Sequence, residues 1–512
     1  MKRLLLLVSV ACAQSPENWT MYSGDYRSLR HSALKAITPV NVEKLSLQWV
    51  YQAKIVEKFE TTPLVIDGVM YLTLPPSDVV ALDAATGVRL WEYKRRIPPK
   101  VQTCCGQVNR GVAVQGERVF AATVDAHMIA LDRKTGRLLW DTEMTDYKPG
   151  YSGTHAPLVV KDKVIAGVAG GEYGIRGFID AYDVATGERK WRFYTVPGPG
   201  EFGHNTWAGD SWKTGGAPLW ITGSYDPELN LTYWGTGNPG PDWNGDVRKG
   251  DNLFSCSVVA LDADTGERKW HFQFTPHDEH DWDATQIMML LDRPVRGRDR
   301  KVLVTANRNG FYYVLDRATG EFLHAKAFVK QTWAEGLDDR GRPMRRPGTL
   351  PTAEGNHVYP QVAGGTNWNS PSYSPVTDLF YVPVREGGSL YYKGAADYKP
   401  GRRFQGGYFN NEQVSHDWYA AVRALDPSTG EMKWEHKMRI PSFAGVLSTA
   451  GGLVFAGTED GYFKALDAST GRDLWHVNLG GKVIASPMSF AVGGAQRVAI
   501  AAGSGLFVFG LR

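Results

Sequence analysis

The stretch that decides the fold is Leu82-Asp83-Ala84-Ala85-Thr86-Gly87-Val88-Arg89-Leu90-Trp91, which has the pattern Leu-Asp-x-x-Thr-Gly-x-x-x-Trp. Two copies change one end of the pattern, because Tyr replaces Leu in Tyr182–Trp191 and His replaces Trp in Leu315–His324. The unchanged copies are Leu131–Trp140, Leu261–Trp270, Leu425–Trp434 and Leu466–Trp475. A phrase that recurs roughly every 40 to 50 residues is typical of a β-propeller or a solenoid.

Each residue type in the phrase suits a β-hairpin. Before the last copy, Val454–Thr458 and Tyr462–Leu466 alternate in the two-residue period of strands, with Glu459-Asp460-Gly461 as the turn between them. The Asp can accept hydrogen bonds from backbone amides of its turn, and the Gly can adopt a left-handed conformation. We expect the Trp to pack against the neighbouring blade, because one four-stranded sheet cannot bury both of its faces. His324, which replaces one Trp, is expected to loosen one such contact and to have no catalytic role.

The repeats predict an all-β fold, an eight-bladed β-propeller with tryptophan-docking motifs. The gap 324–434 is too long for one blade and is expected to contain a blade without the phrase near Tyr373–Val384. A strand ending at Trp49 is expected to close the ring with the strand around Gly505–Gly510, because joining the two chain ends protects the sheet edges. Residues 14–512 are therefore predicted to form a single propeller domain.

Residues 1–13 have the features of a secretory signal peptide. Lys2-Arg3 is the basic start, Leu4–Val10 the apolar core and Ala11-Cys12-Ala13 the cleavage site. Lipidation of Cys12 is the second alternative, because Ser9 stands where a large aliphatic residue is usual. No later segment is long and apolar enough to span a membrane. We therefore predict export to the periplasm.

Composition and cysteine usage exclude two classes of function. The net charge of +3 and the lack of a basic run argue against nucleic-acid binding. No Cys-x-x-Cys-His motif is present, so no c-type haem is attached to this chain. The neighbours Cys104 and Cys105 are either two thiols or a disulfide, which export favours. Cys256 is predicted to be a buried lone thiol.

The segment Thr103–Gly111 begins a series of motifs that resembles the pyrroloquinoline quinone (PQQ)-dependent alcohol dehydrogenases of the methanol and ethanol dehydrogenase type. The other motifs follow in chain order: Gly170–Gly177, Gly235–Pro241, Thr275–Asp281 and Asn307–Gly310. The resemblance extends over essentially the whole mature chain. It implies an eight-bladed propeller, which agrees with the count from the repeats.

The resemblance implies that Glu172, Asn238 and Asp281 are metal ligands. All three offer oxygen donors, which hard cations prefer. Asp283 lies two residues after Asp281, so both side chains point the same way if the segment is extended. An Asp at this position resembles the lanthanide-dependent members, and three carboxylates suit a trivalent ion better than Ca²⁺. The alternative is that Asp283 faces solvent or caps Thr285.

The resemblance also implies the catalytic and cofactor-binding residues. Asp281 is the expected general base, and Arg308 is expected to hydrogen-bond the quinone oxygens. Trp220 is expected to cover one face of the cofactor, and a Cys104–Cys105 ring the other. Around the rim the resemblance places Glu60, Arg110, Thr154, Ala169, Gly170, Gly171, Asn367 and Trp368. Glu60 is unexpected beside an anionic cofactor unless it is protonated or bonded to Arg110.

The expected function is that of an exported quinoprotein dehydrogenase, which oxidises a primary alcohol by hydride transfer to metal-bound PQQ and can then act on the aldehyde. A separate soluble cytochrome c is the implied electron acceptor, and a homodimer is compatible with the resemblance. The loops Trp333–Pro360 and Tyr391–Asp417 are expected to set substrate size. The alternatives are a PQQ-dependent sugar or polyol dehydrogenase and a cofactor-free propeller scaffold of the outer-membrane assembly type. The scaffold needs none of the predicted site residues.

Overall fold

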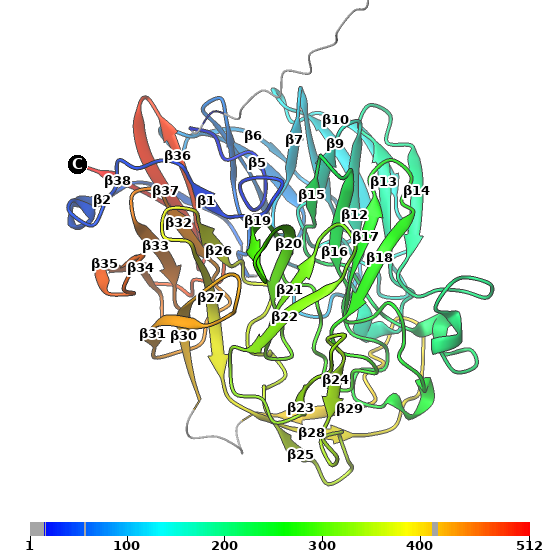
Figure 1. Cartoon of the computed structure of the whole chain (residues 1–512). Coiled ribbons are helices and arrows are strands. Elements are labelled where there is room, and N and C mark those ends of the chain that lie inside the picture. The colour runs from blue at the N-terminus through cyan, green and yellow to red at the C-terminus, as the bar shows by residue number, and fades with distance from the viewer. Residues whose placement is uncertain (1–14, 16, 56–57, 412–417) are drawn as a thin grey trace, which may run out of the picture.

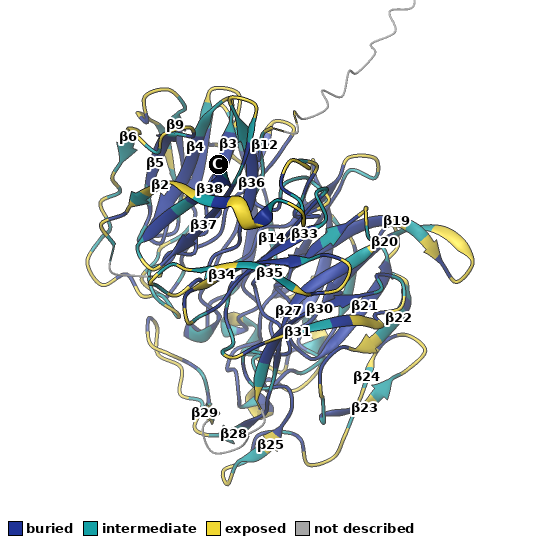
Figure 2. Cartoon of the chain, turned by 90° about the vertical axis from the view of Figure 1, so that its left-hand side faces the viewer, coloured by how far each residue is buried: buried dark blue, intermediate teal, exposed yellow. Residues whose placement is uncertain are grey.

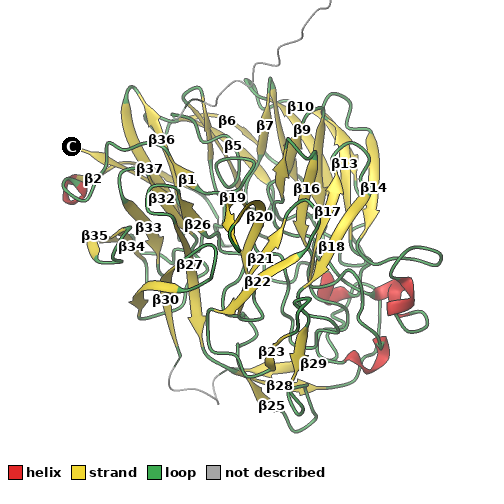
Figure 3. Cartoon of the chain, in the orientation of Figure 1, coloured by secondary structure: helices red, strands yellow, loops and turns green. Residues whose placement is uncertain are grey.

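The computed structural model describes residues 15, 17–55, 58–411 and 418–512. The predicted signal peptide, including Cys12, lies outside the described residues. Strands dominate the described chain, and its helices are short 3-10 turns (Figure 3). These are η1 (Val42–Lys44), η2 (Gly171–Tyr173), η3 (His204–Thr206), η4 (Ser211–Thr214) and η5 (Gly245–Arg248).

Eight antiparallel sheets of blade size account for most strands in the described chain (Figure 1). The first three blades are β3 (Leu64–Ile66), β4 (Val69–Leu74), β5 (Asp78–Asp83) and β6 (Arg89–Tyr93); β7 (Ala113–Gln115), β8 (Arg118–Ala122), β9 (His127–Asp132) and β10 (Leu138–Glu143); and β11 (Leu158–Val160), β12 (Lys163–Gly167), β13 (Phe178–Asp183) and β14 (Arg189–Tyr194). The next two are β15 (Ser224–Asp226), β16 (Leu231–Gly235), β17 (Ser257–Asp262) and β18 (Arg268–Gln273); and β19 (Met289–Val295), β20 (Arg298–Ala306), β21 (Phe311–Asp316) and β22 (Phe322–Ala327).

The remaining three blades complete the ring. They are β26 (Ser372–Ser374), β27 (Leu379–Glu386), β30 (Tyr419–Leu425) and β31 (Met432–Met438); β32 (Val446–Thr449), β33 (Leu453–Gly457), β34 (Tyr462–Asp467) and β35 (Asp473–Asn478), to which β1 (His31–Ser32) adds in parallel; and β36 (Met488–Val492), β37 (Ala495–Ala502) and β38 (Gly505–Leu511) with β2 (Leu45–Gln52). The predicted eight-bladed propeller is confirmed.

The last blade joins the two ends of the chain, as predicted. β2 runs antiparallel to β38, with Leu45 opposite Leu511 and Gln52 opposite Gly505. Figure 1 shows the blue β2 beside the red β38. The pairing occupies an edge of β38 that would otherwise be free, so the ring closes through backbone hydrogen bonds.

The prediction of a separate blade without the phrase near Tyr373–Val384 is wrong. The strands of this region, β26 and β27, belong to the same sheet as β30 and β31, which carry the phrase Leu425–Trp434. The extra length of chain is an insertion between β27 and β30 and a long connection before β26. They form two small sheets, of β23 (Ala334–Leu337) with β24 (Pro343–Arg345), and of β25 (Asn356–Val358), β28 (Ser389–Lys393) and β29 (Gly407–Asn410). Both small sheets gather at one end of the molecule, outside the blades (Figure 1).

The repeated phrase makes the contacts that were predicted for it. In the first copy, the Asp83 carboxylate accepts hydrogen bonds from the backbone amides of Ala85 and Thr86 at 3.1 and 2.9 Å, and Gly87 has φ +74°. The indole of Trp49, from the preceding blade, donates to the carbonyl of Ala84 at 3.3 Å. A Cβ on Gly87 would lie 2.5 Å from that indole. The Gly is therefore required both by its left-handed conformation and by the tryptophan that packs against it.

The docking contact recurs around the ring. The indole N–H of one blade donates to the carbonyl after the Asp of the next blade in the pairs Trp91–Arg133, Trp140–Val184, Trp191–Ala263, Trp270–Arg317 and Trp434–Ala468. At the exception, His324 Nε2 lies 2.9 Å from the carbonyl oxygen of Thr429, and the Tyr312 hydroxyl donates to Pro427 at 3.0 Å. That His324 weakens this contact stays a prediction.

The inner strands of the blades are mostly buried, whereas outermost strands such as β6 and β10 are half-buried or exposed (Figure 2). The apolar core is divided into clusters that neighbouring blades share, as where β7–β10 meet β11–β14. No helix in the described part of the chain is long and apolar enough to cross a membrane. Rigid blades of this kind hold their connecting loops in fixed positions, and the predicted site residues lie mainly on such loops.

Candidate active site

Three predicted residues from separate parts of the chain come together around the Asp283 carboxylate. Asp283 is buried, so the alternative in which it faces solvent is wrong. One of its oxygens accepts from the backbone amide of Asn238, and the other accepts from Trp220 Nε1 at 3.1 Å and Arg308 Nη1 at 2.9 Å. Arg308 Nη2 donates to Asp281 Oδ2 at 3.2 Å. The predicted base Asp281, the predicted ligands Asn238 and Asp283, and Arg308 thus form one connected group.

Asn238 is held with its carbonyl oxygen facing the segment that carries Glu172. Its Nδ2 donates to Asp242 Oδ1 at 2.8 Å, and its Oδ1 lies beside Gly171, where a Cβ would be only 2.7 Å away. Asp242 is fully buried and also accepts from Gln405 Nε2 at 3.2 Å. Because Asn238 Nδ2 donates to Asp242, the side-chain oxygen of Asn238 remains available as a ligand atom for a cation.

Asp242 was not among the residues predicted from the sequence. It directly follows the motif Gly235–Pro241 and lies four residues after Asn238, in the loop after β16. A carboxylate so close to a predicted ligand was the available signal, but its direction depends on the loop and on Gln405, which is distant in sequence. Asp242 adds a further buried negative charge to this group.

The cluster contains more carboxyl groups than cationic groups, and burial together with their closeness shifts their pKa values. Burial raises the pKa of Glu172 to about 7, and the nearby Asp283 adds to the shift. Burial, followed by the charges of neighbouring carboxylates, raises the pKa of Asp281 and of Asp242 well above their ordinary values. Burial acts to lower the pKa of Arg308, but Asp281 and Asp283 raise it above its ordinary value. Four carboxylates around one guanidinium fit a site for a hard, highly charged cation, and oxygen donors are the ligands such a cation prefers.

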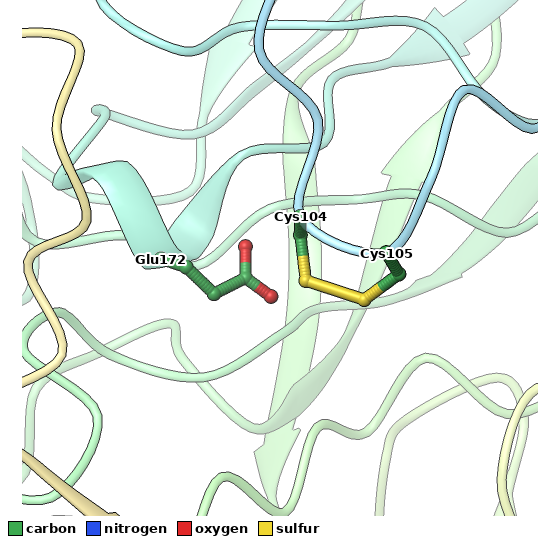
Figure 4. Close-up of side chains that lie close together, drawn as sticks. All are labelled: Cys104, Cys105 and Glu172. Atoms are coloured by element: carbon green, nitrogen blue, oxygen red, sulfur yellow. A yellow bond between two sulfur atoms is a disulfide. The ribbon is translucent and has the colours of Figure 1, made fainter.

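A disulfide borders the acidic group. Cys104 and Cys105 are bonded to each other, and Figure 4 shows the Glu172 carboxylate pointing towards them. The two sulfurs and a Glu172 oxygen lie within 4.8 Å of one another. Arg403 donates to the carbonyl of Cys104 at 2.9 Å, which ties this loop to the segment after β28. Because the two sulfurs form a disulfide and are not thiolates, Glu172 is the anionic metal-ligand candidate among Cys104, Cys105 and Glu172. Cys256 is buried and unpaired, as predicted.

Arg110 connects the remaining predicted residues. Its guanidinium lies 4.5 Å from the ring centroid of Trp368 and 5.2 Å from that of Trp220. It pairs with Glu60 at 2.7 Å and donates to Thr154 Oγ1 at 3.2 Å. Glu60 was expected beside an anionic cofactor only if it were protonated or bonded to Arg110. The structure shows that it is bonded to Arg110.

The backbone around Glu172 is held tightly. Ala169 forms two backbone hydrogen bonds with Ser152, and Gly170 has φ +123°, with a Cβ position only 2.2 Å from the carbonyl oxygen of Gly150. Asn367 donates from Nδ2 to Ala363 and accepts from the backbone of Trp368. The predicted residues thus form a chain of contacts that runs from the metal ligands through Trp220 and Arg110 to Trp368.

The donors around this region also fit an anionic aromatic ligand. Nε of Arg110, Nε of Arg308 and two nitrogens of Arg385 are buried without hydrogen-bond partners among the described residues. Trp220 and Trp368 supply aromatic faces beside Arg110. A flat molecule with several carboxylates would satisfy both the guanidinium groups and the aromatic rings.

Residues 19–326 and 435–498 match the protein family described as PQQ glucose/ethanol/alcohol dehydrogenase, β-propeller domain. The chain belongs to this family of quinoprotein dehydrogenases. The resemblance found in the sequence is confirmed.

Relatives within this quinoprotein family match over almost the whole chain. The quinoprotein alcohol dehydrogenase PedH of Pseudomonas putida is 42% identical, over 93% of this chain and 84% of the relative. The lanthanide-dependent methanol dehydrogenase of Methylacidiphilum fumariolicum is 38% identical, over 93% of this chain and 83% of the relative. The solved structure of a europium-containing methanol dehydrogenase superposes with a TM-score of 0.92 at 35% identity, over 97% of this chain and 99% of that chain.

Proposed function

We propose that this protein is a quinoprotein dehydrogenase that oxidises primary alcohols with PQQ and a metal ion. The observation that carries the proposal is the group of Glu172, Asn238, Asp281 and Asp283 beside the Cys104–Cys105 disulfide, in which Asn238 and Asp283 are buried. The whole-chain similarity to quinoprotein alcohol dehydrogenases supports it. Blade packing alone requires none of these side chains, so a cofactor-free scaffold gives no reason for them.

The residues of this chain take separate roles in the proposed reaction. Asp281 accepts the proton of the alcohol, because its carboxylate is held at the edge of the acidic group by Arg308. Arg308 donates to the quinone oxygens, where negative charge develops. Bound PQQ supplies the hydride acceptor. Trp220 and the Cys104–Cys105 disulfide would hold the two faces of the bound cofactor.

We propose a lanthanide(III) ion rather than Ca²⁺ as the metal. Glu172, Asp281 and Asp283 supply three carboxylate ligands, and Asp242 adds a fourth carboxyl group behind Asn238. More negative charge favours an ion of higher charge. Relatives named for lanthanide and europium content support the choice.

The remaining parts of the proposal rest on the sequence and on its resemblance to the family. Residues 1–13 direct the protein to the periplasm, and residues 14–512 are the propeller domain. A separate soluble cytochrome c would accept the electrons, because the sequence has no haem-attachment motif. The aldehyde product is proposed as a second substrate. A homodimer is the proposed assembly, which light scattering would test.

Dye-linked alcohol oxidation by the purified apoprotein, after addition of PQQ with LaCl₃ or CaCl₂, tests the proposal. Turnover of primary alcohols with La³⁺ alone is the expected result. Turnover with Ca²⁺ alone would support the proposed dehydrogenase activity and refute the proposal that the metal is a lanthanide. Turnover of sugars or polyols in place of simple alcohols would change the substrate class. No turnover with either metal, together with no binding of PQQ, would refute the enzyme and favour the propeller scaffold.

A further inference from the structure

Arg385 is a buried cation with unused hydrogen-bond donors within the described part of the chain. It lies near the end of β27 and is only 7% exposed, and neither its Nε nor its Nη2 has a hydrogen-bond partner among the described residues. No ion pair within that part of the chain includes it. Arg423, on the neighbouring strand β30, has a different environment, because it pairs with Glu386 at 2.8 Å and with Glu435 at 2.6 Å.

An unpaired guanidinium in the interior is energetically unfavourable. Burial lowers the pKa of Arg385 to about 10, so the group stays charged at neutral pH. Removing an ion from water without a counter-ion or hydrogen bonds destabilises a fold. The other deeply buried arginines avoid this cost: Arg30 donates to the carbonyls of Tyr22 and Pro487, and Arg248 donates to three carbonyls and to Asn252.

The Arg385 side chain is connected to the proposed cofactor site through aromatic rings. Its guanidinium lies 3.8 Å from the ring centroid of Phe443, and Phe443 is stacked on Trp368 at 6.2 Å with an interplanar angle of 6°. Trp368 also carries Arg110 on its ring. The rings of Phe443 and Trp368 therefore lie between Arg385 and Arg110, and both Trp368 and Arg110 are predicted rim residues.

The backbone places Arg385 next to the other end of the site as well. Its amide donates to the carbonyl of Gly365 at 2.8 Å, and the amide of Gly365 donates to the carbonyl of Arg308 at 3.0 Å. Arg385 thus lies between the arginine proposed for the quinone oxygens and the tryptophan at the rim. None of the residues predicted from the sequence occupies this position.

We propose that Arg385 binds a carboxylate of the quinone cofactor. The inference rests on the proposed function, because it concerns the same site. PQQ carries three carboxylates, and Arg110 already shares its charge with Glu60. The face of the Arg385 guanidinium rests on Phe443, so its edge remains free to donate two parallel hydrogen bonds to a carboxylate. The bound cofactor then supplies the counter-ion that the protein alone lacks.

The test is a titration of the apoprotein with PQQ at saturating La³⁺, followed by quenching of tryptophan fluorescence. R385Q is expected to raise the Kd about tenfold or more, as loss of a charge-assisted hydrogen bond does, and R385K is expected to raise it less. The control is R268Q. Arg268 also rests on aromatic rings, those of Phe202 and Phe254, but lies in the outer strand β18, so its replacement is expected to leave the Kd unchanged.

Thermal unfolding of the same apoproteins separates ligand binding from a structural role. Because R385Q removes an unpaired buried charge, the apo variant is expected to be at least as stable as the wild type. A wild-type Kd for PQQ in R385Q and R385K overturns the inference, as does a loss of apo stability with no change in Kd.

A change confined to the KM of hydroxy-acid substrates would overturn it in favour of a substrate carboxylate. If R385Q does not fold, R385K decides by the same Kd. If the wild type itself does not bind PQQ, the proposed function fails together with this inference. If the wild type and R385Q bind equally, only this inference fails.

Discussion

Replacing Asp242 separates two contributions of its carboxylate to the proposed metal site. Asp242 accepts from Asn238 Nδ2 at 2.8 Å and from Gln405 Nε2 at 3.2 Å, and it adds a buried negative charge. D242A removes both contributions, whereas D242N keeps an oxygen that can accept from Asn238 and removes the charge alone.

The magnitude follows from these contacts. A hydrogen bond to a charged acceptor contributes about 1.5–3 kcal/mol, and outer partners of metal ligands typically change affinity by about 10- to 100-fold. We therefore expect D242A to weaken La³⁺ binding about 10- to 100-fold. Because attraction scales with ionic charge, the loss of one negative charge costs a trivalent ion about 1.5 times as much as a divalent one. D242N should therefore reduce the preference for La³⁺ over Ca²⁺.

The assay is binding of Tb³⁺ to the apoprotein, followed by tryptophan-sensitised luminescence, with La³⁺ and Ca²⁺ as competitors. Trp220 donates to Asp283 at 3.1 Å, so an indole lies next to the proposed ion. The matched control is D246A, which removes a carboxylate four residues away whose side chain is 67% exposed and paired with Lys393. Wild-type affinity for Tb³⁺ in D242A would refute this account of how Asn238 is held.

The remaining predictions test packing, electrostatics and catalysis. G87A should destabilise the protein by about 3 kcal/mol or more, because a Cβ there would lie 2.5 Å from Trp49, whereas G68A, at φ +78° with open space around it, should cost only about 1 kcal/mol; equal effects in urea unfolding would contradict the docking argument. Burial raises the folded-state pKa of Glu172 from 4.5 to about 7, so the folded apoprotein binds more protons than the unfolded chain in this window, and its free energy of unfolding should fall by up to about 3 kcal/mol between pH 4.5 and 7. Saturating La³⁺ should abolish this fall, and an apoprotein that gained stability over the same range would be evidence against the shift. R308K should lower kcat about 100-fold with a smaller change in KM, because an ammonium cannot keep the two-pronged contact of the guanidinium; an unchanged kcat would exclude Arg308 from the reaction.

The local pattern of the chain was enough to predict the blades. The Asp-x-x-Thr-Gly turn is formed by contacts within a few residues, as between Asp83 and Thr86, so every copy can be found by reading along the sequence. The docking Trp could also be predicted, because a sheet with one uncovered face needs an apolar cover. Which residues filled the long gaps could not be predicted, because insertion strands such as β28 pair with partners far away in sequence.

For the site, the sequence identified which residues to consider, but only the fold determined their contacts. Glu172, Asn238, Asp281 and Arg308 lie in recognisable motifs, so the sequence determined which side chains to consider. It could not determine that Asp283 would accept from Asn238, Trp220 and Arg308 at once, because these residues lie on separate loops that only the fold brings together.

Asp242 and Arg385 lie in no motif that the sequence marked as functional. Asp242 matters because Gln405, over 160 residues away, helps to hold it against Asn238. Arg385 matters because the fold surrounds it with Phe443, Gly365 and no carboxylate partner among the described residues. Turn chemistry depends on neighbours in sequence and can be read there, whereas the burial and pairing of a charge depend on which distant segments the closed ring brings together.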